Sequence, residues 1–126
     1  MKINLKATNI ELSEAISQYV DKKLIMLEKY FEQSKGDEVL ALIEVGKSTR
    51  HHKSGDVFMA EIHIKANGKE FYAVSEKDDL YAAIDEVKDE ITRSITSRRK
   101  KAIALLRRGG TRIKEMLKNL PFRRRR

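Results

Sequence analysis

The segment SEKDDLYAAIDEVKDEITRSITSRRKKAIALLRR, residues 75–108, decides the fold of this chain. Its apolar side chains recur at helical spacings of 4, 3, 4 and 4 from Leu80 to Ile95, which predicts one long amphipathic helix over about residues 78–106. Ser75-Glu76-Lys77-Asp78 resembles a capping box, so we expect the helix to start near Ser75. Such a helix is roughly 43 Å long, whereas a seven-residue strand spans only about 23 Å. The helix should therefore extend beyond the sheet that it covers.

The same segment changes character after Ile95. Arg98 falls on the helix face that carries Leu80, Val87 and Ile91, where a core does not accept a lone charge. A run of bases follows, with Arg98-Arg99-Lys100-Lys101 and then Arg107-Arg108. We predict that the core ends near Ile95 and that the rest of the helix faces solvent or a polyanion.

The remaining elements follow in chain order. Alternating residues predict a strand over 2–8, and Ser13 is a plausible N-cap for a helix whose apolar stripe reaches Phe31. The apolar run at 38–47 favours an interior strand, although a short helix fits the same pattern. Asn67-Gly68 between two alternating runs predicts a hairpin of strands 57–66 and 69–74, in which residues 66 and 69, 64 and 71, and 62 and 73 pair.

The predicted order is β-α-β-β-β-α, an α+β fold in which two helices pack on one face of a four-stranded sheet. The hairpin should turn Phe58, Ala60, Ile62, Ile64, Phe71 and Ala73 towards this core. Its other face should carry Glu61, His63, Lys65, Glu70 and Tyr72, with Lys65 opposite Glu70 as a favourable pair. We divide the chain into an α+β domain, residues 1–106, and a basic C-terminal tail, residues 107–126.

The net charge of +8 is very unevenly distributed. Residues 98–126 carry +12, whereas residues 1–97 carry −4. A basic tail on a mildly acidic body suggests an anionic partner, most often nucleic acid, and the alternative is a tail that only adds solubility. The chain has no cysteine, no run long enough to span a membrane and no signal-like start, so we expect a cytoplasmic protein without disulfides.

Catalytic and metal-binding patterns are weak. His51 and His52 are adjacent and lack a nearby carboxylate at ligand spacing, and His63 falls on the outer face of its strand. Ser97-x-x-Lys100 is a common pattern, and the acid pairs Asp78-Asp79 and Asp85-Glu86 are expected at the helix start or on its solvent side. We predict no enzyme, no metal, no cofactor, no membrane contact and no small-molecule substrate.

Basic clusters support RNA contact better, because Lys and Arg neutralise phosphates and release counterions. They occur in the first helix, in the loop at residues 47–55 and along the last helix. The candidate RNA-binding residues are Lys22, Lys23, Lys29, Arg50, Lys53, Lys88, Arg93, Arg98, Arg99, Lys100, Lys101, Arg107 and Arg108. Tyr81 is more typical of a core edge than of a base-stacking platform.

The element order, the phrase Asp79-Leu80-Tyr81-Ala82-Ala83-Ile84-Asp85 and the basic helix that follows resemble the ribosome hibernation-promoting factor family, which includes the ribosome-associated inhibitor. Val20-Asp21-Lys22-Lys23-Leu24 and Asn67-Gly68 add to a resemblance that covers about residues 1–106. It implies a fold similar to a double-stranded-RNA-binding domain. Asp79, Tyr81 and Asp85 match the signature, and we expect structural roles for them. By position, the matching basic residues are Lys22, Lys23, Lys29, Lys88, Arg93, Arg98, Arg99 and Lys101.

The resemblance implies a translation inhibitor. Its members bind 16S rRNA of the small ribosomal subunit in the 70S ribosome, in the mRNA and tRNA channel at the A and P sites, under stress or in stationary phase. This chain has no room for the dimerisation domain of long members, and it ends in four arginines where some short members are acidic. The alternative is a general RNA-binding or RNA-chaperone module that uses its basic tail, and an enzyme acting on nucleic acid is a third, weaker reading.

Overall fold

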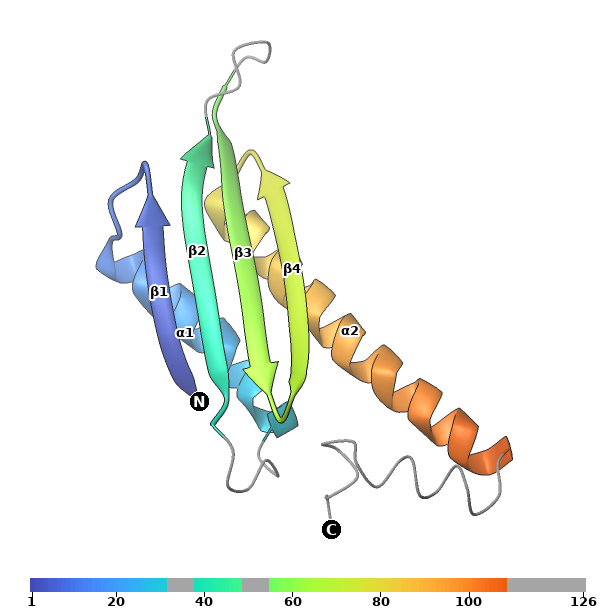
Figure 1. The fold of residues 1–126 in the computed structure, drawn as a ribbon. Helices are drawn as coiled ribbons and strands as arrows, with labels where there is room; N and C mark the ends of the chain where they lie inside the picture. The colour runs from blue at the N-terminus through green and yellow to red at the C-terminus, as the bar shows by residue number, and fades with distance from the viewer. Residues whose placement is uncertain (32–37, 49–54, 109–126) are drawn as a thin grey trace.

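The computed structural model describes residues 1–31, 38–48 and 55–108. Its elements are β1 (Lys2–Thr8), α1 (Glu14–Glu28), a 3₁₀ turn η1 (Lys29–Phe31), β2 (Leu40–Ser48), β3 (Val57–Ala66), β4 (Lys69–Lys77) and α2 (Leu80–Arg108). The predicted order β-α-β-β-β-α is confirmed, and Figure 1 shows both helices crossing the same face of the sheet.

The four strands form one mixed sheet in the order β1-β2-β3-β4. β1 pairs parallel to β2 because α1 carries the chain back between them, whereas β2, β3 and β4 pair antiparallel. The hairpin has the predicted register, Ala66 with Lys69 and Ile64 with Phe71. Its turn residues Asn67 and Gly68 have φ of 54° and 75°, the positive values that the tight turn requires. The interior strand predicted at 38–47 is β2.

The core lies between the sheet and the two helices. Ser13 caps α1 as predicted, because its hydroxyl accepts a hydrogen bond of 3.1 Å from the Ile16 N–H. Residues that share the inner face of each element are buried, and the stripe of α2 is buried from Leu80 to Ile95. The core from the helices and the hairpin comprises Val20, Leu24, Leu27, Ala60, Ile62, Ile64, Phe71, Ala73, Leu80, Ile84, Val87, Ile91 and Ile95.

The start of α2 differs from the prediction. β4 continues to Lys77 and not to 74, so Ser75 is a buried strand residue whose hydroxyl donates to the Glu86 carboxylate. Asp79 caps the helix: its carboxylate accepts from the Ala82 N–H at 3.2 Å, and its carbonyl accepts from the Ala83 N–H at 3.0 Å. The capping-box reading of Ser75 was wrong because pairing with β3 holds Ser75 in the sheet.

The C-terminal part of α2 extends past the end of the sheet, as its length required (Figure 1). Ile95 is the last α2 residue of the core cluster, as predicted, but the rest of α2 does not face solvent throughout, because Ala102 is also buried and Arg98 lies over the Phe71 ring. α2 ends at Arg108, two residues beyond the predicted domain boundary at 106. The rest of the predicted tail, residues 109–126, lies outside the described residues.

Candidate nucleic-acid interface

The two ends of α2 carry opposite charge. Residues 80–90 contain four acids and one base, whereas residues 91–108 contain seven Lys or Arg and no acid. Acids near a helix N-terminus and bases near its C-terminus also interact favourably with the helix dipole, so this pattern supports the helix itself. Ile91 and Ile95 still belong to the core, but beyond them the basic end extends past the sheet, which leaves its exposed charges available to a polyanion.

Five of the predicted contact residues are exposed on this basic end: Arg93, Lys100, Lys101, Arg107 and Arg108. Arg93, Lys100 and Arg107 are each seven residues apart, which places them along one side of the helix at intervals of about 10.5 Å. Lys101 and Arg108 have the same spacing on a neighbouring line. The basic end therefore presents straight rows of cations, a form suited to successive phosphates.

Arg98 and Arg99 lean back onto the domain. The Arg98 guanidinium carbon lies 5.0 Å from the centre of the Phe71 ring. Arg99 donates a hydrogen bond of 3.2 Å to the Tyr30 carbonyl oxygen, and its guanidinium carbon lies 5.5 Å from the Tyr30 ring. Both arginines thus help to fix the point at which α2 leaves the sheet, in addition to the RNA contact predicted for them.

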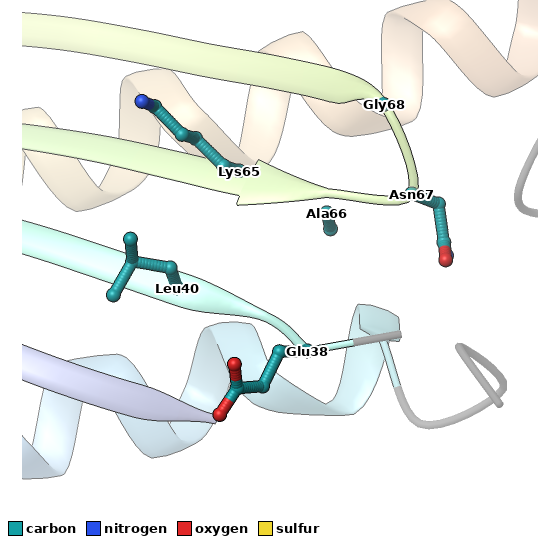
Figure 2. Close-up of a pocket in the computed structure, with 6 residues that line it drawn as sticks. All are labelled: Glu38, Leu40, Lys65, Ala66, Asn67 and Gly68. Carbon is teal, nitrogen blue, oxygen red and sulfur yellow. The ribbon is translucent and has the colours of Figure 1, made fainter. Parts of the chain in front are cut away.

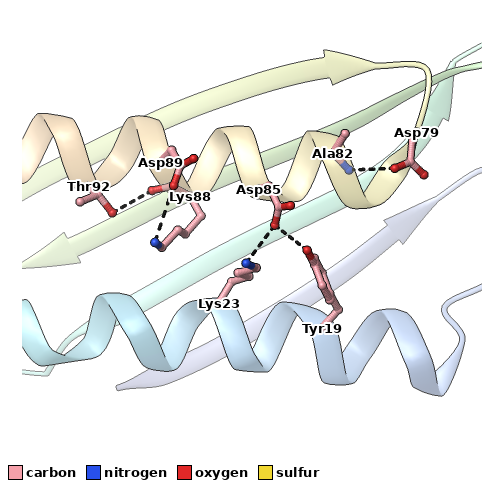
Figure 3. A network of polar contacts seen from close by, with 8 residues as sticks. All are labelled: Tyr19, Lys23, Asp79, Ala82, Asp85, Lys88, Asp89 and Thr92. Atoms are coloured by element: carbon pink, nitrogen blue, oxygen red, sulfur yellow. Dashed lines mark hydrogen bonds and ion pairs between the residues drawn. The ribbon is translucent and has the colours of Figure 1, made fainter.

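The predicted contacts of the first helix divide between α1, which holds Lys22 and Lys23, and η1, which begins with Lys29. Lys22 and Lys29 are exposed. The Lys23 ammonium lies 3.1 Å from Oδ1 of Asp85 on α2, and its side chain is only 21% exposed. Figure 3 shows Lys23 and Tyr19 reaching from α1 to Asp85. Of these predicted contacts, Lys22 and Lys29 are therefore the two free to meet a phosphate without breaking an ion pair.

The contact between the helices shifts the pKa values of its three members. Partial burial alone raises the pKa of Asp85, but hydrogen bonds from Tyr19 and Lys23 outweigh it and hold this pKa below its usual value. The same carboxylate raises the pKa of Lys23 and that of the Tyr19 hydroxyl. At neutral pH Asp85 is therefore a carboxylate and Lys23 an ammonium ion, which is the pairing that joins α1 to α2.

The remaining candidates are less accessible or lie outside the described residues. The Lys88 side chain is 15% exposed, and its ammonium lies 3.6 Å from the Asp89 carboxylate. Arg50, Lys53 and the adjacent histidines of the loop at 47–55 lie outside the described residues, as does the tail from residue 109. The RNA-binding roles of all these residues stay predictions.

Sequence reasoning placed the signature residues correctly as structural but missed most of their partners. Tyr81 packs edge-on against Tyr19, with 4.8 Å between ring centres. The pair Asp85-Glu86, expected on the solvent side, instead faces its neighbours: Asp85 contacts α1, and Glu86 contacts Ser75 and Lys77 of β4. One available signal was that Tyr19 and Lys23 are four residues apart and share a side of α1.

The outer face of the hairpin also differs in detail. Lys65 is opposite Glu70 in the register, as predicted. The Glu70 carboxylate, however, lies 2.7 Å from Nε2 of His63. His63 is on β3, two residues before Lys65. His63 therefore has a specific partner in Glu70. Its ring also contacts the Tyr72 ring edge-on, with 5.8 Å between the ring centres.

Other features of the described residues are weaker candidates for a functional site than the basic end of α2. A depression of about 440 Å³ lies where the hairpin meets the start of β2, lined by Glu38, Leu40, Lys65, Ala66, Asn67 and Gly68 (Figure 2). Within residues 1–31, 38–48 and 55–108, no three His, Cys, Asp or Glu side chains gather as a metal site would need. Nor does either helix described here combine the length and apolar character that a membrane span requires.

Comparison with known proteins gives the family. The family model described as Sigma 54 modulation protein / S30EA ribosomal protein matches residues 3–103. The ribosome hibernation promoting factor of Escherichia coli is 35% identical over 101 residues, which cover 80% of this chain and 96% of that protein. The ribosome hibernation promotion factor of Picosynechococcus is 33% identical, and the match covers 80% of this chain but 50% of that longer protein.

Solved structures agree. The N-terminal domain of Thermus thermophilus Protein Y has a TM-score of 0.61 and 28% identity, over 75% of this chain and 96% of that domain. A ribosomal subunit interface protein from Coxiella burnetii has a TM-score of 0.58, over 79% of this chain and 99% of that one, and at 16% identity it supports the fold alone. With its β-α-β-β-β-α order and its matched residues 3–103, the chain belongs to the Sigma 54 modulation protein / S30EA ribosomal protein family.

Proposed function

We propose that this protein is a ribosome hibernation factor that inhibits translation by occupancy. It binds 16S rRNA of the small ribosomal subunit within the 70S ribosome, fills the mRNA and tRNA channel at the A and P sites, and acts in the cytoplasm under stress or in stationary phase. Its relatives carry the name ribosome hibernation promoting factor, which supports the ribosome as the partner.

The observation that carries the proposal is the acid-free C-terminal end of α2, which extends past the sheet. Its exposed Arg93, Lys100 and Arg107 form a row on a helix that Arg98 anchors to the sheet and Arg99 to η1. A rigid, cationic projection suits a binding mode in which phosphate contacts hold a folded body in place. No turnover is needed for such an inhibitor, because a filled channel excludes mRNA and tRNA.

The direct test is co-sedimentation of the full chain with ribosomes over a range of salt concentrations. We expect binding to small subunits and 70S ribosomes at low salt, and its loss when mRNA and initiator tRNA are added first. Inhibition of translation in a purified system should follow the same concentration dependence. An absence of ribosome binding at every salt concentration would rule the proposal out.

A chain lacking residues 109–126 separates this proposal from a general RNA-binding module that uses its tail. An occupancy mechanism predicts retained ribosome binding with a smaller salt dependence. A tail-driven module predicts that binding to ribosomes and to unrelated RNA is lost together. Unrelated structured RNA in excess should compete in the second case and compete poorly in the first.

A further inference from the structure

The face of the sheet opposite the helices is acidic. No described helix or strand covers it (Figure 1). The outward positions of β2, β3 and β4 hold four glutamates against a single lysine, Lys65, whereas the outward positions of β1 add two exposed lysines, Lys2 and Lys6, so that the acidic part of the face lies over β2, β3 and β4. These glutamates are Glu44, Glu61, Glu70 and Glu76. This face therefore has the opposite sign to the basic end of α2.

The β4 side of this face is also apolar. Tyr72 is 57% exposed and Val74 is 45% exposed, more than any other large hydrophobic residue of the described strands. Glu61 lies diagonally across from Tyr72 in the β3–β4 register, and β4 is an edge strand. An exposed aromatic ring beside carboxylates is a favourable binding site for a guanidinium group, because this group stacks on the ring and pairs with the acid.

The acids are incompletely compensated. Glu44 and Glu61 are directly opposite each other in the β2–β3 register, an arrangement of like charges that destabilises a sheet. Lys6 is opposite Glu44 on β1, but the described contacts of the Glu44 carboxylate are with the neutral Thr8 hydroxyl, at 2.6 Å. A cation placed between Glu44 and Glu61 would relieve this repulsion.

We propose that the outer face of β3 and β4 docks an extended segment of another protein, in which a cation, arginine or lysine, and an apolar residue take turns at every second position, so that both kinds of side chain face the sheet. Outward residues of β4 recur about every 6.6–6.8 Å, which is the spacing of alternate side chains in an extended peptide. Cations then meet Glu61 and the Tyr72 ring while an apolar residue covers Val74. Phosphates are repelled by the four glutamates, and a second copy placed face to face would present the same charges.

This inference does not depend on the proposed function, and its test needs no ribosome. The ¹⁵N-labelled full chain is titrated with a short synthetic peptide in which arginine and valine take turns at every second position and threonine fills the positions between them. A second peptide has glutamine in place of every arginine. We expect amide shifts to concentrate on β3 and β4 around Glu61, Tyr72 and Val74 with the arginine peptide, and no saturable shifts with the glutamine peptide.

Matched variants test the site. Glu44→Gln with Glu61→Gln should raise the peptide Kd by about tenfold, which corresponds to about 1.4 kcal/mol. Glu11→Gln with Glu14→Gln, near the start of α1, removes the same charge elsewhere and should leave the Kd within twofold. Tyr72→Ala should also raise the Kd although it changes no charge. Glu44→Gln with Glu61→Gln keeps the shape of both side chains and removes the repulsion between them. A folding defect is therefore not expected to mimic the rise in peptide Kd.

Three outcomes overturn the proposal. One is that the amide shifts spread over all exposed acids and that both Glu→Gln double variants weaken peptide binding equally. Another is a Tyr72→Ala variant that binds as the unmodified chain does. The third is an absence of saturable shifts on β3 and β4, including the case in which residues 109–126 of this chain already occupy the face.

Discussion

The Asp85 carboxylate on α2 accepts a hydrogen bond from the Tyr19 hydroxyl on α1, with 2.6 Å between the two oxygen atoms. The same carboxylate pairs with Lys23, whose ammonium also lies 5.1 Å from the centre of the Tyr19 ring. Three side chains thus join α1 to α2, the helix that packs on β3 and β4. This contact fixes the angle between α1, with its exposed Lys22, and the basic end of α2.

A double-mutant cycle on this pair should show coupling. Tyr19→Phe removes only the hydroxyl and should lower the free energy of unfolding by about 1 kcal/mol. Asp85→Ala should lower it by a similar amount, and the double variant should lose less than the sum. Urea unfolding measures all three. Tyr30→Phe is the control, because the contacts of Tyr30 with Arg99 use its carbonyl and ring; strict additivity would show that the hydrogen bond contributes nothing.

The stability of the domain should fall at acid pH partly through Asp85. Its pKa in the folded protein is lowered, so the unfolded chain takes up a proton at higher pH than the folded one does. This contribution is complete above the unfolded pKa of about 4 and is lost as pH falls through the lowered folded pKa. The stability gap between the unmodified chain and Asp85→Asn should therefore narrow from pH 7 to pH 3. A gap that stays constant over this pH range would contradict the role assigned to Asp85.

Two interpretations of where α2 begins can be tested separately: a capping box at Ser75 and a cap at Asp79. Asp79→Ala should lower the free energy of unfolding by about 1 kcal/mol because the Ala82 N–H loses its acceptor, whereas Asp79→Asn should retain most of it. Ser75→Ala removes a hydroxyl that contacts Glu86 from within β4, so it should not change the helical signal. If Ser75→Ala shortened α2 and Asp79→Ala did not, the helix would begin where the capping-box pattern placed it.

The difference between these readings shows what sequence alone could supply. Periodicity and Asn67-Gly68 specify the elements, the hairpin register and the end of the core at Ile95, because each depends on local geometry or on spacing along one chain segment. The site is different. Whether Lys23 faces solvent or Asp85, and whether Arg98 faces solvent or Phe71, depends on how residues far apart in sequence come together. A run of bases looks uniform in sequence, although the fold divides it into anchoring and exposed side chains.

The division of the basic run into anchoring and exposed side chains gives the most direct test of the candidate interface. Arg98→Glu with Arg99→Glu and Lys100→Glu with Lys101→Glu reverse the same amount of charge within about one turn of α2. The lysine pair is exposed and should weaken ribosome binding and reduce its salt slope by about 0.7–0.9 per lost phosphate contact, while the unfolding midpoint stays unchanged. The arginine pair should weaken binding and also lower the free energy of unfolding by about 1–2 kcal/mol, since it loses the stack on Phe71 and the bond to the Tyr30 carbonyl.

Urea unfolding and co-sedimentation on the same four-residue stretch make the comparison internal to one helix. Equal unfolding midpoints for the two double variants would show that Arg98 and Arg99 anchor nothing and serve the ligand alone. Unchanged ribosome binding in the lysine pair, with the fold intact, would show that the exposed row on α2 is not the contact surface. Because both variants change the net charge equally, a difference between them reports the position of the side chains and not the overall charge of the protein.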